Sequence, residues 1–206
     1  MGAEMGVGPD VEHHGHHSTG HRWLDVTLGV SAVFISLMSV LLALQHGRAM
    51  ERMVQANTWP FVMVEHDTAY ADGSPHFSMW ITNNGVGPAK VGSIEVFYGE
   101  TATQNTGSLI RTMLKISDPN RKIKRTTSDV IGTVLPAREK LFLFELLPGQ
   151  LAPEESERLR DGFASVHSRV CYCSVFDECW VLDERSPTLR PEPVKACPVP
   201  KVMFKE

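Results

Sequence analysis

An uncharged run of 19 residues near the N-terminus constrains the architecture of this chain most. Residues 26–44 read VTLGVSAVFISLMSVLLAL, and their only polar side chains are threonine and serine hydroxyls. A helix of this length spans roughly 28 Å at about 1.5 Å per residue, close to a hydrocarbon core of about 30 Å. Hydroxyls are tolerated there because they can donate to carbonyls of their own helix. The run therefore predicts one transmembrane helix.

A buried core helix and a cleaved signal peptide are the two competing interpretations. The apolar part of a signal peptide spans about 7–15 residues and follows a basic segment. This run is longer, and the segment before it is acidic and rich in histidine. We therefore expect an uncleaved anchor with a helical stalk over residues 23–58, ended by Trp59-Pro60 because a residue before proline disfavours the α conformation. Residues 1–22 hold few large apolar groups, which predicts a disordered tail.

Small residues recur on one face of the expected anchor, at alternating spacings of three and four. Small side chains let helix backbones approach closely in lipid, which favours association between helices. The pattern predicts packing against a second copy of the chain or against another membrane protein, and chance spacing is the alternative. This seam consists of Gly29, Ala32, Ser36, Ser39 and Ala43.

After the stalk the hydrophobic pattern changes from helical to alternating, and turn residues separate the apolar runs. Short strands of this kind predict a mainly β domain over residues 59–185, an antiparallel immunoglobulin-like β-sandwich. Residues 108–116 and 153–161 fit either helices or lids. The last segment is a Pro-rich extension, 186–206. Its five prolines all lie within 186–200, which predicts that this stretch runs extended over the surface and does not pair as a central strand. The expected strands are Phe61–Glu65, Phe77–Thr82, Lys90–Phe97, Leu141–Leu146 and Arg169–Phe176.

Four features occur together in this chain: the single anchor, the NTWPF junction at 57–61, the NNGVGPA loop at 83–89 and the CYCSVFDECW segment at 171–180. In this combination the chain resembles a group of uncharacterised bacterial inner-membrane proteins with one N-terminal anchor and a small β-sandwich. The resemblance covers about residues 23–183 and implies that architecture, but no activity. The NNGVGPA loop itself is typical of a turn between strands, because Asn and Gly accept positive φ and the spacing fits no phosphate-binding motif.

The four cysteines all lie in the last quarter of the chain, which suits disulfides formed in an oxidising compartment. Cys171 and Cys173 would point to the same face of one strand, so they are not expected to bond to each other. A two-residue turn at 177–178 would direct Cys179 away from that face, whereas a three-residue turn would bring it onto that face. We expect at least one disulfide, formed by Cys179 or by Cys197, which could attach the Pro-rich extension to the sheet.

The same cysteines allow a soft-metal hypothesis. Thiolates of Cys171 and Cys173 on one face would suit an ion such as Cu(I). The tail adds the possible copper, nickel or zinc ligands His13, His14, His16 and His17. The Cys-aromatic-Cys pair resembles that of the anchored copper chaperones of cytochrome oxidase assembly, but the resemblance stops at that pair. A structural disulfide framework without any cofactor is the alternative.

Catalysis has less support in the sequence. Neither a nucleophile elbow nor an HExxH zinc motif occurs. His66, His76 and His167 could be combined with an aspartate into a triad, which leaves an envelope enzyme as a third hypothesis. The basic segment RKIKR at 121–125 could contact lipid headgroups or an acidic partner, or could be a solvated loop. The formal net charge of −4 argues against binding nucleic acid through bulk charge.

Two opposed signals bear on the side of the membrane that the domain occupies. The count of basic residues beside the apolar run slightly favours a cytoplasmic domain, because Arg48 and Arg52 follow the run and Arg22 precedes it. The clustered cysteines favour the periplasm, and we give them more weight. The sequence thus predicts a single-pass bacterial inner-membrane protein that acts as a non-catalytic interaction module or as an accessory subunit of a membrane complex. Its expected partners are the lipid bilayer and other membrane subunits or a second copy of the chain.

Overall fold

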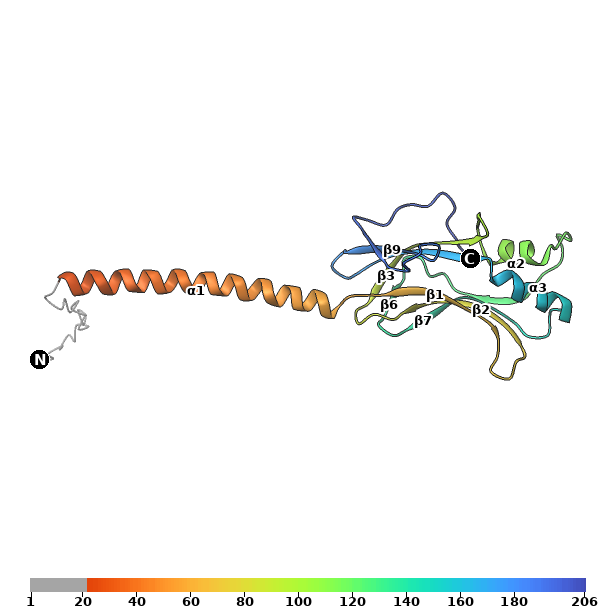
Figure 1. Ribbon diagram of the computed structural model, residues 1–206, viewed down its shortest axis with the longest axis horizontal. Helices are drawn as coiled ribbons and strands as arrows, with labels where there is room; N and C mark the ends of the chain where they lie inside the picture. The colour runs from red at the N-terminus through yellow and green to blue at the C-terminus, as the bar shows by residue number, and fades with distance from the viewer. Residues whose placement is uncertain (1–21) are drawn as a thin grey trace, which may run out of the picture. The chain divides into compact units, whose positions relative to one another are not determined.

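The structure, a computed structural model, describes residues 22–206 and combines one long helix with a mainly β domain (Figure 1). The chain divides into two units, Met1–Glu51 and Arg52–Glu206. The predicted tail lies outside the described residues, and so do its candidate metal ligands His13, His14, His16 and His17.

The helix α1 (Arg22–Asn57) is long and apolar enough to span a membrane, and none of its residues is buried. The segments predicted as anchor and stalk form one continuous helix that ends before Trp59-Pro60. Its hydroxyls bond back to the helix backbone, as in the 2.9 Å bond from Ser36 Oγ to the Ala32 carbonyl. The polar groups of the apolar stretch therefore need no partner from lipid. All five seam residues are exposed, and a Cβ added at Gly29 would meet no atom within 4 Å.

Two antiparallel sheets form the β domain. The first has the strand order β1-β2-β7-β5, and the second has the order β10-β9-β8-β3-β4, with β6 paired to β3. The first sheet contains β1 (Val62–Ala69), β2 (Pro75–Asn83), β7 (Lys140–Leu146) and β5 (Arg125–Thr127). The second contains β3 (Ala89–Tyr98), β4 (Thr101–Thr103), β6 (Val134–Leu135), β8 (Val166–Cys173), β9 (Cys179–Asp183) and β10 (Glu192–Val194).

Both sheets contribute to one hydrophobic core, because alternate residues of each strand point to the same face. Ile81 of the first sheet and Ile94 and Tyr172 of the second are completely buried in the same cluster. The mainly β prediction is thereby confirmed. The five expected strands occur as β1, β2, β3, β7 and β8, but β8 ends at Cys173 and not at Phe176.

Two helices cover the end of the domain opposite the start of β1 (Figure 1). They are α2 (Thr106–Leu114) and α3 (Pro153–Phe163), and they occupy the two segments for which the sequence allows either a helix or a lid. The Asn105 side chain caps α2 by accepting the Ser108 N–H at 2.9 Å. The helices pack closely because α3 has Gly162 at the contact, where a Cβ would lie 2.9 Å from Met113 Sδ.

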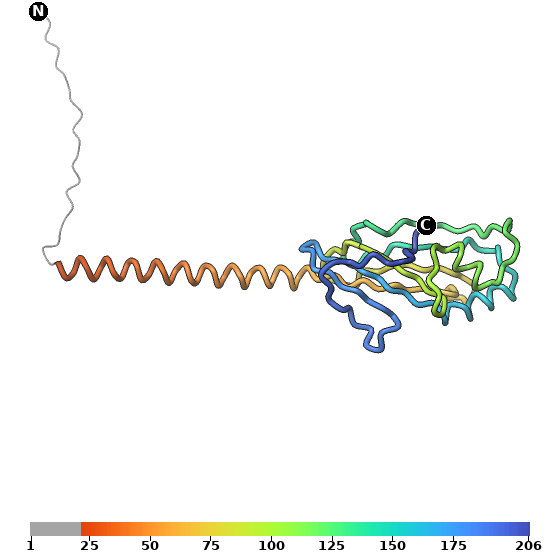
Figure 2. The backbone as a smooth tube through the Cα atoms, turned by 90° about the horizontal axis from the view of Figure 1, so that it is seen from above, coloured from red at the N-terminus to blue at the C-terminus, as the bar shows by residue number. Residues whose placement is uncertain are grey.

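The Pro-rich extension does more than run over the surface. Its strand β10 pairs with β9 at the sheet edge, where Pro193 can be accommodated without interrupting a central ladder. The chain then turns back along the domain (Figure 2). Phe204 is only 2% exposed, and its N–H donates to the Ile94 carbonyl at 2.9 Å. No residue of 186–200 is buried and this stretch pairs only at the sheet edge, as expected, whereas Phe204, after the last proline, enters the core.

Candidate functional site

Two cysteines of β8 lie on the face of the second sheet that points away from the shared core. Because Val170 and Tyr172 occupy the core, Cys171 and Cys173 point to the opposite face. The loop 174–178 joins β8 to β9, and Cys173 stands directly across from Cys179. This loop is longer than either turn considered from the sequence. Its odd number of residues nevertheless places Cys179 on the same face as Cys173.

All four cysteines are joined in two disulfides. Cys173 is bonded to Cys179 across the hairpin, and Cys171 is bonded to Cys197 of the extension. The second bond attaches the extension to the middle of β8. No cysteine within residues 22–206 is free, so neither Cys171 nor Cys173 offers a thiolate to a metal in this state.

A glycine of β3 makes room for the bond to the extension. β3 pairs with β8, but the register shifts between Val91 and Ser93, which marks a bulge at Gly92. A Cβ at Gly92 would lie 2.5 Å from Cys197 Sγ, far inside van der Waals contact. We missed this residue in the sequence, although a glycine inside an apolar strand is a known signal for a bulge or a close approach.

The two disulfides lie next to each other. Cys173 Sγ is 3.8 Å from Cys197 Sγ, and the sulfurs of Cys173, Cys179 and Cys197 all lie within 4.8 Å of one another. If both bonds were reduced, these three thiolates would be close enough to share one soft ion. The structure therefore divides the predicted pair Cys171 and Cys173 between two bonds and brings a different set of sulfurs together.

A buried amide holds the loops together where the chain enters the β domain. Asn83 is completely buried, and its Nδ2 donates to the carbonyls of Gly87 at 2.8 Å and Leu135 at 3.1 Å. Its Oδ1 accepts the N–H groups of Phe61 at 3.2 Å and Gly85 at 3.0 Å. One side chain thus links the start of β1, the 83–89 loop and the end of β6.

The glycines of the 83–89 loop serve close packing and not positive φ. Neither Gly85 nor Gly87 adopts the left-handed conformation expected for this loop. A Cβ at Gly85 would overlap the backbone of Trp59 and Phe61, and one at Gly87 would overlap that of Thr58. The loop remains a connection between two strands, as predicted. Its glycines are needed because it packs directly on the NTWPF junction.

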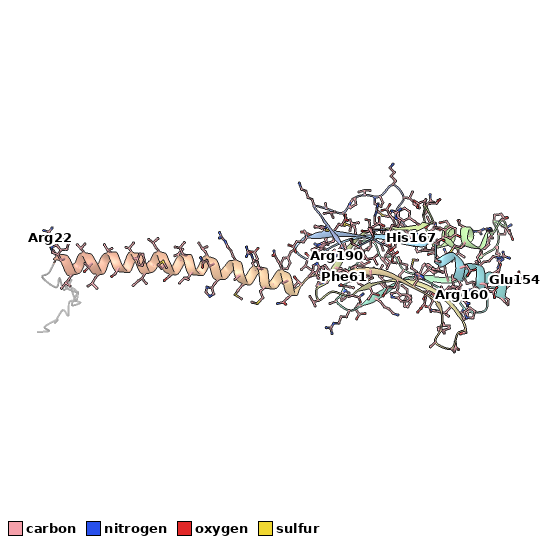
Figure 3. All side chains as sticks on the ribbon, viewed as in Figure 1. Arg22, Phe61, Glu154, Arg160, His167 and Arg190 are labelled. Atoms are coloured by element: carbon pink, nitrogen blue, oxygen red, sulfur yellow. A yellow bond between two sulfur atoms is a disulfide. The ribbon has the colours of Figure 1, made fainter. Side chains whose placement is uncertain are left out.

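Exposed apolar side chains gather at this same end of the domain, which holds Phe61 in Figure 3. The Trp59 carbonyl accepts the Val86 N–H at 3.0 Å, and the ion pair between Lys90 and Asp177 holds the β8–β9 loop beside β3. The apolar residues of these loops and of the start of β6 are between 43% and 59% exposed. We call them the junction surface: Trp59, Val86, Val134, Val175 and Phe176.

The three histidines considered for a triad are separated. His66 stacks on Phe163 with ring centroids 5.0 Å apart, and His76 stacks on Tyr70 at 4.0 Å. His167 lies on the other sheet, opposite Phe97 (Figure 3). Within the described part of the chain, no hydrogen bond or ion pair joins these histidines to an aspartate. The structure therefore does not assemble the triad.

Tyr172 belongs to the core, on the face of β8 opposite the disulfides. Its side chain is completely buried, and it stands directly opposite Trp180 of the neighbouring strand β9. Burial raises the pKa of Tyr172 to about 12, because the phenolate would lose its hydration, and a weak contact with the Val62 N–H offsets little of this effect. The phenol is therefore neutral at physiological pH and contributes to packing.

No protein-family model, curated protein or solved structure matches this chain. Three arrangements within the described residues remain as starting points for a function. They are the paired disulfides, the junction surface and a basic cavity beside α2.

Proposed function

We propose that this chain is a single-pass protein of the bacterial inner membrane with a periplasmic, immunoglobulin-like β-sandwich. The domain would serve as a non-catalytic interaction module or as an accessory subunit of a membrane complex. The apolar, fully exposed α1 supports the anchor. The use of all four cysteines in disulfides supports an oxidising compartment. The architecture also fits the uncharacterised membrane proteins that the sequence resembles.

The junction surface is the observation that carries this proposal. Single exposed apolar residues are ordinary, but a group drawn from several segments of the chain is typical of a protein contact. Trp59 and Phe176 add aromatic rings, which are enriched in the buried centre of interfaces. The surface adjoins the point where the chain leaves α1, which favours another membrane protein as its partner.

Site-specific photo-crosslinking in native membranes tests the proposal. A photoreactive amino acid placed at Val86 or at Phe176 of the full-length chain should give an adduct with a discrete membrane protein. The matched control positions are Glu154 and Arg160 on α3, which are exposed at the opposite end of the domain (Figure 3). They should give none.

A second substitution distinguishes a specific contact from chance proximity. Val86→Asp introduces a charge into the junction surface and should abolish the adduct formed from Phe176. Adducts of equal yield from both ends of the domain, or an adduct that survives Val86→Asp, would show that the junction surface is not the partner site.

Soft-metal handling is the second candidate, favoured by the grouping of three sulfurs within 4.8 Å. The chain would bind Cu(I) through Cys173, Cys179 and Cys197 after reduction of both disulfides, because soft thiolates select Cu(I). The test adds Cu(I) to full-length protein reduced under anaerobic conditions, in competition with a Cu(I) chelator. Retention of copper by the reduced chain, lost in Cys173→Ala/Cys179→Ala, supports this candidate. Failure to compete with the chelator rejects it.

A further inference from the structure

A basic cavity opens beside α2. It has a volume of about 580 Å³ and lies between α2, the segment 115–124 and β5. Three isoleucines supply its apolar wall, and none of its lining residues, all within the described chain, carries a carboxylate. This concentration of positive charge contrasts with the net charge of −4 of the whole sequence. The cations that line the cavity are Arg111, Arg121, Lys122, Lys124 and Arg125.

Two of these cations are neutralised by carboxylates. Arg121 donates to Glu155 Oε2 at 2.7 Å, and this ion pair holds the pKa of the Glu155 carboxyl below its usual range. Arg125 Nη2 lies 3.6 Å from Glu206 Oε2. Lys122 is exposed, as is Lys124, and among the described residues neither forms an ion pair.

The loop that carries these lysines is held in place before any ligand arrives. Arg111 donates to the carbonyls of Asp118, Pro119 and Arg121 at 2.8–3.0 Å. The Gln150 side chain accepts the Lys124 N–H and donates to the Lys124 carbonyl at 2.7 Å. A binding loop that is already ordered loses less conformational entropy on binding.

A carboxylate of the chain itself already occupies the wall beside the cavity. The Glu206 side chain, 8% exposed, accepts the Thr106 N–H at 2.8 Å and also the Thr106 hydroxyl. Its carboxylate thus lies between the N-terminus of α2 and the Arg125 guanidinium, whose buried Nε has no partner within residues 22–206. A helix N-terminus with an arginine is a donor set that also suits phosphate.

We propose that the cavity binds a phosphate-bearing ligand with a small apolar part. The phosphate contacts Lys122, Lys124 and Arg125, and the apolar part packs on the isoleucines. The volume is within the range of small-molecule sites. Glu206 neutralises part of the charge of Arg125 and so weakens binding of a second anion. This inference is independent of the junction surface. The phosphate could belong to a soluble metabolite or to a lipid headgroup.

Titration of the full-length chain in nanodiscs of neutral lipid with pyrophosphate tests the site. Lys122→Ala/Lys124→Ala should weaken pyrophosphate binding by about tenfold or more, because charge-assisted bonds to phosphate are lost. Lys195→Ala/Lys201→Ala is the matched control, with the same charge change at exposed lysines of the extension, and should leave binding unchanged. Glu206→Gln should tighten it, since Arg125 then loses its carboxylate partner.

Vesicles of phosphatidylcholine with one quarter phosphatidylglycerol distinguish the source of the phosphate. Saturable pyrophosphate binding that depends on Lys122 and Lys124 identifies a soluble ligand. Lysine-dependent association with these vesicles, without pyrophosphate binding, identifies a headgroup. If neither probe binds, or if the control variant weakens binding as much as Lys122→Ala/Lys124→Ala does, the cavity is not the site.

Discussion

Removing the two disulfides one at a time should cost unequal amounts of stability. The Cys171–Cys197 bond joins residues 26 apart in sequence, whereas the Cys173–Cys179 bond joins residues 6 apart. A cross-link lowers the entropy of the unfolded chain by an amount that grows with the logarithm of the loop length. At 25 °C this model gives about 3.5 kcal/mol for the longer loop and about 2.2 kcal/mol for the shorter one.

The perturbation is a pair of double substitutions, Cys171→Ala/Cys197→Ala and Cys173→Ala/Cys179→Ala. Alanine leaves no free thiol, which matters because sulfurs of the two bonds lie only 3.8 Å apart and a thiolate could exchange with the remaining disulfide. The extension should stay in place without its bond, because β10 and Phe204 also hold it. For a domain of this size the two costs correspond to falls in Tm of about 7–14 °C and about 4–9 °C.

Denaturant unfolding of the full-length chain in detergent, followed by tryptophan fluorescence without reductant, measures both costs. Trp59, Trp80 and Trp180 lie in the β domain and report its unfolding. From loop-closure entropy alone, Cys171→Ala/Cys197→Ala should be the less stable variant by about 1.3 kcal/mol. If Cys173→Ala/Cys179→Ala costs as much or more, loop closure does not account for the stabilisation, and native contacts of the hairpin bond must dominate.

Three further predictions concern the buried amide, the buried phenol and the seam. Asn83→Asp replaces the donor to three carbonyls with a buried charge and should lower the free energy of unfolding by about 3 kcal/mol or more. The control Asn84→Asp, at the exposed neighbour, should cost little. Denaturant midpoints compare the two variants, and equal costs would contradict the role given to Asn83. Burial raises the pKa of Tyr172 in the folded state to about 12, above its unfolded value. The unfolded chain therefore loses this proton first, and about 3 kcal/mol of stability that is present below pH 10 should be lost as the pH rises toward 12. In Tyr172→Phe this part of the alkaline loss should vanish, and an unchanged pH profile of unfolding would refute the assignment. Ala32→Leu/Ser36→Leu in the seam should abolish self-association, measured by crosslinking in membranes, whereas Val30→Leu/Phe34→Leu on the opposite face should preserve it. Equal crosslinking of the two variants would exclude the seam as the contact between helices.

Local patterns were enough to predict the elements with strong periodicity. The apolar run and the Trp59-Pro60 stop predict α1 to within one residue at each end. Strands with β-branched and aromatic residues were also predictable, because their alternation is set by one buried face. The strands β4, β5, β6 and β10 have two or three residues each, too few to show a period, and exist through pairing with distant strands.

The candidate site was less predictable than the elements, because it depends on contacts between segments that are distant in the sequence. The clustering of cysteines and the face shared by Cys171 and Cys173 could be read along the chain. Their partners could not, because the pairing follows from the length of the loop after Cys173 and from the return of the extension to β8. The role of Asn83 is hidden for the same reason, since its amide bonds a carbonyl 52 residues away. Glu206 at the N-terminus of α2 gave no sequence signal.

The buried position of Phe204 has a consequence for the order in which the molecule is made. α1 leaves the ribosome early and can enter the membrane while the β domain is still being synthesised. The core of that domain lacks one of its side chains until residue 204 has emerged, since Phe204 packs there and bonds to Ile94. With α1 as the proposed anchor, a nascent chain would be attached to the membrane before it can complete its fold. A ribosome stalled before Phe204 would leave a domain with an open core, exposed to proteases.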